Sequence, residues 1–264
     1  MCHTSIFYVI MYKKGSDFLS DRLIKAFKGF DGVTAAFSTR CGGVSEGAFA
    51  SLNPGIFSGD SKENIEKNLS LICDELGVAR ESLIFNHQVH GADVTDVISA
   101  EMCTDIRDAD CFVTAISGIT LTCITADCVP ILFFDPVKKV IATAHAGWRG
   151  TVAGSQKAAV AAMLGYGSKA SDILVEIGPC ISTAAYEVSE DVASQFDAST
   201  VDLSYEKPHI DLRRANAEML ISCGIKPTNI KISPLCTFER EDMFFSHRRT
   251  GLPRGTQTAF ISLR

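Results

Sequence analysis

Residues 121–151, LTCITADCVPILFFDPVKKVIATAHAGWRGT, carry the pattern around which the predicted fold is organised. An apolar, β-branched run from Leu121 to Phe134 predicts a buried strand. A second run from Val140 to Ala146 predicts another strand and is followed by a glycine. Asp135-Pro136 between the two runs is typical of a turn. The stretch therefore predicts a buried β-hairpin.

The register of this hairpin brings two reactive side chains together. A loop over residues 135–138 pairs Phe134 with Lys139 and places Cys128 directly opposite His145. Side chains opposed in this way have Cβ atoms about 4.5–5.5 Å apart. At that separation they can share one metal ion, whose bonds to thiolate and imidazole are about 2.0–2.3 Å long. A different loop length, or a bulge at Pro130, would shift the register by one residue.

The composition is that of a globular protein. The 264 residues are long enough for one large domain or two small ones, and 46% of them are hydrophobic. The net charge of −6 comes without any basic block, which argues against a nucleic-acid partner and against an anionic membrane surface. The apolar run Ile6 to Met11 is too short to span a bilayer and more closely fits an edge strand.

The cysteines indicate a reducing compartment. Ten are present, and no two of them have C-x-x-C spacing. Most lie inside apolar runs, where a reduced cysteine behaves as a small hydrophobic residue, so about eight are expected to be inert buried thiols. We therefore expect a cytoplasmic protein.

Strand and helix patterns alternate along the rest of the chain without a repeat or a linker. This predicts an α+β (mixed α/β) fold, a single layered domain over residues 1–264 with helices packed on a mixed β-sheet. No G-x-G-x-x-G or P-loop pattern occurs, which argues against a nucleotide held by its phosphates in those ways. The remaining expected strands are 33–39, 82–85, 173–177, 230–233 and 258–263, and the expected helices are 61–76, 151–164, 189–196 and 211–223.

Three side chains are candidate metal ligands: His90, Cys128 and His145. Each lies near the end of an expected strand, beside a Gly or Pro that can open the backbone into a cleft. Side chains alternate along a strand, so His87 and His90 point to opposite faces and only one of them can enter a given site. Two histidines and one cysteine suit Zn²⁺, with the fourth position left open as in catalytic sites, and they also suit copper. The alternative is a core cysteine with two hydrogen-bonded histidines.

Three arginines are candidate anion-binding residues: Arg40, Arg149 and Arg248. Each lies in a polar segment next to Gly, Ser or His, and a guanidinium binds phosphate or carboxylate through paired hydrogen bonds. The alternative for each is a solvated surface arginine. Trp148, the only tryptophan, is either a packing anchor or a platform for a flat ring.

Two further polar residues are candidates for acid–base work. Asp127 precedes Cys128, and on a strand it points to the opposite face unless the backbone bulges. It is a candidate partner for a metal-bound histidine or a candidate general acid or base. His247 is a weaker candidate of the same kind, with an ordinary surface histidine as the alternative.

At these residues the sequence resembles the YfiH-type family, bacterial laccase-domain proteins that are also described as purine nucleoside phosphorylases. The resemblance covers residues 37–249, and the pair formed by ADCVP and HAGWRG is highly specific. The matching segments are FSTRCGG (37–43), SLNPG (51–55), HQVHG (87–91), TADCVPILFFD (125–135), HAGWRGT (145–151), IGPCI (177–181) and FFSHRR (244–249).

The resemblance implies a zinc site formed by His90, Cys128 and His145, and it favours His90 over His87. It also implies a fold similar to that of putative cysteine hydrolases. Family members are reported to cleave purine nucleosides, including methylthioadenosine, with phosphate, and to deaminate adenosine. Others are described as copper-dependent polyphenol oxidases, and one is linked to peptidoglycan-precursor editing. SLNPG stands where the family usually has S-L-N-L-G, Gly255-Thr256-Gln257 stands where it commonly has G-R-Q, and residues 1–30 lie outside the motifs.

The leading hypothesis is a zinc-dependent purine nucleoside enzyme acting on small molecules, a nucleoside and phosphate. Arg40, Arg149 and Arg248 are the candidates for binding the phosphate, and a zinc-bound water would serve deamination. A thiol hydrolase with Cys128 as nucleophile and His145 as base is the second hypothesis. A copper oxidase of phenols is the third, although the chain contains only six histidines. A scaffold protein without catalysis is the fourth.

Overall fold

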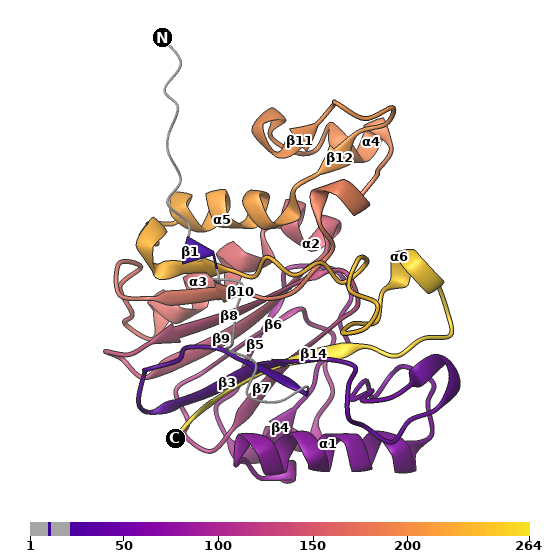
Figure 1. Cartoon of the computed structure of the whole chain (residues 1–264). Coiled ribbons are helices and arrows are strands. Elements are labelled where there is room, and N and C mark those ends of the chain that lie inside the picture. Colours follow the sequence, from indigo (N-terminus) through magenta and orange to yellow (C-terminus); the bar gives the residue numbers. More distant parts are fainter. Residues whose placement is uncertain (1–9, 12–21) are drawn as a thin grey trace.

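Two β-sheets form the centre of the protein, and helices cover the outer face of each (Figure 1). The computed structural model describes residues 10–11 and 22–264. One sheet has seven strands in the order β1-β13-β10-β8-β9-β6-β5, and the other has five in the order β2-β3-β14-β7-β4. Each contains parallel and antiparallel pairs. The expected mixed α/β domain is therefore confirmed, although its strands are divided between two sheets.

The bounds of the elements are as follows. The strands are β1 Ile10–Met11, β2 Leu23–Lys25, β3 Val33–Ser38, β4 Leu83–Ile84, β5 Val94–Asp96, β6 Cys111–Thr114, β7 Thr120–Thr125, β8 Val129–Asp135, β9 Val140–Ala146, β10 Leu174–Ile177, β11 Val201–Asp202, β12 His209–Ile210, β13 Ile230–Ile232 and β14 Gln257–Leu263. The α-helices are α1 Lys62–Leu76, α2 Trp148–Ala153, α3 Ser155–Gly165, α4 Glu190–Ala193, α5 Leu212–Ser222 and α6 His247–Thr250.

The core has three layers because the central strands are apolar on both faces. On β8, Ile131 and Phe133 pack into the layer beneath α3 and α5. The alternate residues Leu132 and Phe134 pack into the layer between the two sheets. A third layer lies between the five-stranded sheet and α1. Successive strand residues point to opposite faces, so a continuous apolar run is what a strand buried on both sides requires.

The run from Leu121 to Phe134 is not one strand, contrary to our prediction. It is divided into β7 and β8, which belong to different sheets. The chain crosses between the sheets through residues 126–128, where Asp127 has a φ of +96°. Hydrophobicity continues through the crossing because both strands are buried, so the apolar pattern alone did not reveal the break.

The predicted register of the hairpin is also wrong. Pro130, not Cys128, pairs with His145. The loop is displaced because the Asp135 side chain accepts hydrogen bonds from the backbone N–H groups of Val137 (2.8 Å) and Lys138 (3.0 Å). Asp135 therefore pairs with Val140 and closes a four-residue loop. The register moves by two residues, which leaves every side chain on its expected face.

The helices α1 and α5 begin and end close to their expected bounds. Ser61 caps α1 through the N–H of Asn64, and Gly77 ends it in the left-handed conformation. Asp211 caps α5. The expected helix 151–164 begins earlier and is divided by Gly154, with a φ of +86°, into α2 and α3. The expected helix 189–196 shortens to α4, and the strand 82–85 shortens to β4.

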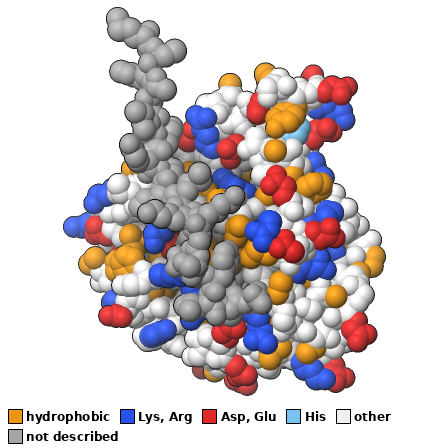
Figure 2. Space-filling view, in the orientation of Figure 1, with side chains coloured by type: hydrophobic (Ala, Val, Ile, Leu, Met, Phe, Trp, Pro, Cys, Tyr) orange, Lys and Arg blue, Asp and Glu red, His pale blue; other side chains and the backbone are white. Residues whose placement is uncertain are grey.

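The surface agrees with the absence of a basic block from the sequence. On the face in Figure 2, acidic and basic side chains are interspersed.

Residues 10–11 of the expected edge strand form β1 beside β13, and residues 6–9 lie outside the described part of the chain. Within the described residues no helix has the length and apolar character needed to cross a membrane. The nine cysteines described are all free thiols.

Candidate metal centre and active site

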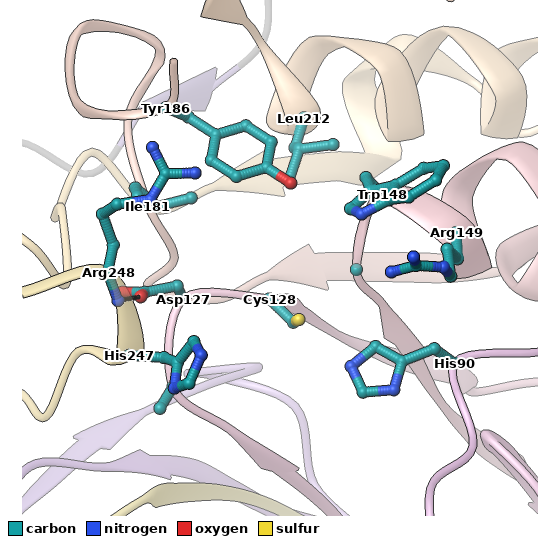
Figure 3. Close-up of a pocket in the computed structure, with 12 residues that line it drawn as sticks. His90, Asp127, Cys128, Trp148, Arg149, Ile181, Tyr186, Leu212, His247 and Arg248 are labelled. Carbon is teal, nitrogen blue, oxygen red and sulfur yellow. Dashed lines mark hydrogen bonds between the residues drawn. The ribbon is translucent and has the colours of Figure 1, made fainter. Parts of the chain in front are cut away.

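A pocket of about 300 Å³ opens where β8 begins and β9 ends. Its wall comes from the crossing before β8, the start of α2, the chain around Ile181 and Tyr186, and the start of α6. Figure 3 shows Cys128 at its centre, with His90, Trp148 and Arg149 on one side and Asp127, His247 and Arg248 on the other. With the loop that carries His90 and the start of α5 at Leu212, six segments distant in the sequence meet at one cavity. Its size is at the lower end of the range for small-molecule sites.

His90, Cys128 and His145 come together at this pocket. One potential ligand atom from each lies within 4.8 Å of the others. His90 belongs to the loop before β5 and has a φ of +62°, Cys128 immediately precedes β8, and His145 is on β9. His87 instead lies outside, where its ring contacts Phe57 and Asp108. The three side chains, two imidazoles and a thiol, fit a zinc site with three protein ligands.

Gly147 makes room for this cluster. A Cβ atom built at Gly147 would lie 2.8 Å from Sγ of Cys128 and 3.2 Å from Cδ2 of His90. The first separation is shorter than side-chain packing tolerates. The φ of Gly147 is −66°, which other residues also adopt, so its backbone conformation does not require glycine. The close approach of Cys128 and His90 does.

Asp110 holds two of the three candidate ligands in place. Its buried carboxylate accepts a hydrogen bond from Nδ1 of His145 at 2.8 Å. The same carboxylate accepts the backbone N–H groups of Val89, His90 and Gly91 at 3.2, 3.0 and 2.7 Å. The bond from Nδ1 leaves Nε2 of His145 as the nitrogen available to a metal. Asp110 was not identified as a candidate from the sequence, because its partners lie in separate segments of the chain.

The charges of Cys128 and His145 support each other. Burial by itself would raise the pKa of the Cys128 thiol, but His145 and then His90 lower it to about 6. Burial would likewise lower the pKa of His145, but the thiolate of Cys128 and the carboxylate of Asp110 raise it to about 9. At neutral pH the metal-free site therefore holds a thiolate beside an imidazolium. A thiolate is the form of cysteine that binds a metal.

Asp127 connects the pocket to the C-terminal part of the chain. Its Oδ1 accepts a hydrogen bond from the Thr237 hydroxyl at 2.6 Å. Its Oδ2 accepts hydrogen bonds from the Ser246 hydroxyl at 3.0 Å and from the N–H of Arg248 at 2.7 Å. These bonds place Arg248 and His247 across the pocket from His90. They give Asp127 a positioning role, while its role as an acid or base stays a prediction.

Two of the three candidate arginines line the pocket. Arg149 stacks on the Trp148 ring, with its guanidinium carbon 4.2 Å from the ring centroid. Arg248 lies over the Tyr186 ring at 5.1 Å. Tyr186 was not identified from the sequence. Burial raises its pKa to about 12, so its hydroxyl keeps its proton at neutral pH.

Arg40 is not among the residues that line the pocket. Its Nε and Nη2 both donate to the carbonyl of Ala50, at 2.9 and 2.5 Å, and Nη1 donates to the carbonyl of Glu241. The guanidinium also lies over the Phe245 ring. Arg40 therefore links residues 37–50 to residues 241–245 through hydrogen bonds and a ring contact. The resemblance would place an arginine at Thr256. The backbone N–H of Thr256 donates to Oδ1 of Asn53, and Thr256, like Arg40, does not line the pocket.

Comparison with known proteins identifies the family to which this chain belongs. The sequence model of the family described as "Multi-copper polyphenol oxidoreductase laccase" matches residues 34–264. The chain belongs to this laccase-domain family. The expected YfiH-type resemblance is therefore confirmed.

Curated laccase-domain relatives carry the name purine nucleoside phosphorylase. The protein of that name from Bacteroides thetaiotaomicron is 31% identical over 88% of this chain and 92% of its own length. Purine nucleoside phosphorylase YlmD from Bacillus subtilis is 34% identical over 88% of this chain and 89% of its own length.

Solved laccase-domain structures have the same fold. The hypothetical protein YfiH from Bacillus licheniformis superimposes with a TM-score of 0.88 and 29% identity, covering 94% of this chain and 98% of that one. YlmD from Geobacillus stearothermophilus superimposes with a TM-score of 0.86 and 31% identity, covering 92% and 96%. The expected YfiH-type fold is thus confirmed.

Proposed function

We propose that this laccase-domain protein is a zinc-dependent purine nucleoside phosphorylase that also deaminates adenosine. Its nucleoside substrates would be adenosine, inosine, guanosine and methylthioadenosine. The observation that carries the proposal is the cluster of His90, Cys128 and His145. Two of its members, His90 and Cys128, line a pocket that also presents two arginines and two large aromatic rings. The names of the curated relatives support the phosphorylase part.

Zinc is favoured by the chemistry of the candidate ligands. Cys128 has a pKa of about 6 and is available as a thiolate, while Asp110 orients His145 through the ring nitrogen that faces away from the cluster. When bound, zinc would supply a positive charge that polarises substrate oxygens and activates water for deamination. Copper also accepts these ligand types, so the metal content of the purified protein must be measured to distinguish zinc from copper.

The protein's own residues can supply the remaining requirements of phosphorolysis. An oxygen of phosphate forms a bond to C1′ of the ribose, the bond from C1′ to the purine nitrogen breaks, and the purine takes up a proton. Arg149, next to the candidate ligands, is suited to hold the phosphate through paired hydrogen bonds. The rings of Trp148 and Tyr186 offer flat apolar surfaces for the purine. The protonated Tyr186 hydroxyl can donate a hydrogen bond to the nucleoside.

The proposal is tested on wild-type protein purified without added metal. Metal content is measured first, and inosine phosphorolysis and adenosine deamination are then assayed before chelation, after chelation and after zinc is added back. We expect both activities to disappear with the metal and to return with zinc. Full activity of verified metal-free protein on either substrate would reject zinc dependence for that reaction.

A thiol hydrolase acting on peptidoglycan precursors is the second candidate, favoured by the Cys128 thiolate beside His145. Such an enzyme would remain active after metal removal and would be inactivated by a single alkylation at Cys128. A copper-dependent polyphenol oxidase is the third candidate, and only the family description favours it. Within residues 10–11 and 22–264 one His, Cys, Asp or Glu cluster of metal-binding geometry occurs. Oxygen consumption with phenols and copper tests this candidate directly.

A further inference from the structure

Two arginine–aromatic pairs face each other across the pocket. Arg149 lies on Trp148 on the side of the candidate metal ligands, and Arg248 lies on Tyr186 on the opposite side (Figure 3). Among the described residues, neither guanidinium is within ion-pair distance of an Asp or Glu side chain. Phosphorolysis requires one phosphate, which the proposed function assigns to Arg149. The cation on the far side is left without an assigned ligand.

The far side carries further positive charge. Arg248 donates from Nη1 to the carbonyl of Glu187 at 2.9 Å, which fixes the stem while Nη2 stays available. The half-buried Arg254 donates from Nε to Nδ1 of His247 at 3.3 Å. Nδ1 of His247 accepts this hydrogen bond, and the imidazole, which lines the pocket, adds a polar group beside Arg248.

The nearby carboxylates do not neutralise this side. Both oxygens of Asp127 already accept hydrogen bonds from Thr237, Ser246 and the backbone of Arg248. The Glu187 carboxylate is paired with Lys207 at 2.8 Å. Two carboxylates, those of Asp127 and Glu187, therefore stand against three cations, Arg248, Arg254 and Lys207, and an anion is the ligand that this arrangement attracts.

We propose that the Arg248 side of the pocket binds a phosphate ester carried by the substrate itself, so that purine nucleoside 5′-monophosphates are ligands of this site. The inference rests on the proposed function and names a substrate class for it. One phosphate at Arg149 and a second at Arg248 account for the two separate cations. Phosphorolysis of such a ligand forms a bond from a phosphate oxygen to C1′ and breaks the glycosidic bond. It yields the free base, after protonation, and ribose 1,5-bisphosphate.

The test measures binding in phosphate-free buffer by titration calorimetry. Inosine, inosine 5′-monophosphate and inorganic phosphate are titrated separately into the wild-type protein. Inosine and its monophosphate have no 6-amino group to lose, and neither can be phosphorolysed without phosphate, so both are measured unchanged. We expect the monophosphate to bind at least about tenfold more tightly than inosine, equivalent to about 1.4 kcal/mol.

Two variants locate the effect. Arg248→Met should remove the preference for the monophosphate and leave the affinity for inorganic phosphate unchanged. Arg149→Met, the matched change on the other side, should weaken inorganic phosphate and keep the preference. Equal affinity of wild-type protein for inosine and its monophosphate would overturn the inference, as would loss of inorganic phosphate binding in Arg248→Met. Tight binding of the monophosphate, combined with no cleavage of inosine or of the monophosphate once phosphate is added, would support the anion site and reject the phosphorylase function.

Discussion

The Asp110 carboxylate and Nδ1 of His145 are 2.8 Å apart, and neither side chain is accessible to solvent beyond a few per cent. The same carboxylate holds the backbone on both sides of His90. One acidic group therefore sets the positions of two candidate ligands from separate segments. Partners of this kind commonly change metal affinity by roughly 10–100-fold when they are removed.

Asp110→Asn should weaken zinc binding by about 10–100-fold. The amide NH₂ group would face backbone N–H groups that now donate to a carboxylate, so donors would oppose donors. Zinc affinity is measured by competition with a chelating dye. Asp108→Asn is the matched control, because Asp108 binds the exposed His87. Equal losses in the two variants would contradict the positioning role of Asp110.

Gly147→Ala should lower zinc affinity while the protein still folds. The added methyl would lie 2.8 Å from Sγ of Cys128, and the thiolate would have to move away from the two histidines. Gly165→Ala serves as the control, because a Cβ there meets no atom within 4 Å. Zinc content after dialysis and the midpoint of thermal unfolding distinguish a local effect from general destabilisation. Unchanged zinc content in Gly147→Ala would show that the cluster does not need this space.

Cys128 should react as a thiolate in metal-free protein well below the pH at which an ordinary cysteine does. Its pKa is lowered from 9.0 to about 6, so the thiolate fraction rises as pH increases through about 6. The rate of alkylation by iodoacetamide, followed by mass spectrometry of the Cys128 peptide, should have its midpoint near that pH. Zinc should protect the thiol. A midpoint near pH 9 would mean that His145 does not stabilise the thiolate.

Arg40→Lys should lower the free energy of unfolding by about 1–3 kcal/mol and leave zinc bound. Lysine keeps the charge but cannot reproduce the two bonds to the carbonyl of Ala50 together with the bond to Glu241. Arg240→Lys, at an exposed arginine paired with Asp242, should change the stability by less than about 0.5 kcal/mol. Chemical denaturation provides both values. Full stability with greatly reduced turnover would instead support the predicted contact of Arg40 with substrate.

Local pattern in the sequence predicted the type of fold. The apolar runs that became β8 and β9 are buried on both faces, and a strand between two layers must be apolar throughout. The expected helix 61–76 agrees with α1, whose ends are capped by Ser61 and Gly77 through chemistry that depends on adjacent residues alone. The site candidates His90, Cys128 and His145 also came from the sequence, through residue type and through motifs that resemble a known family.

Tertiary structure decided how these parts meet. The crossing at Asp127 is held by Thr237 and Ser246, which lie more than a hundred residues later and leave no periodic signal. The hairpin register depended on the hydrogen bonds of Asp135 to its own loop, and apolar pattern is the same for registers two residues apart. Asp110 and Tyr186 acquired their roles from contacts between distant segments. The sequence by itself determined the ligand types and the buried strands, whereas the packing of the two sheets determined which side chains share the pocket.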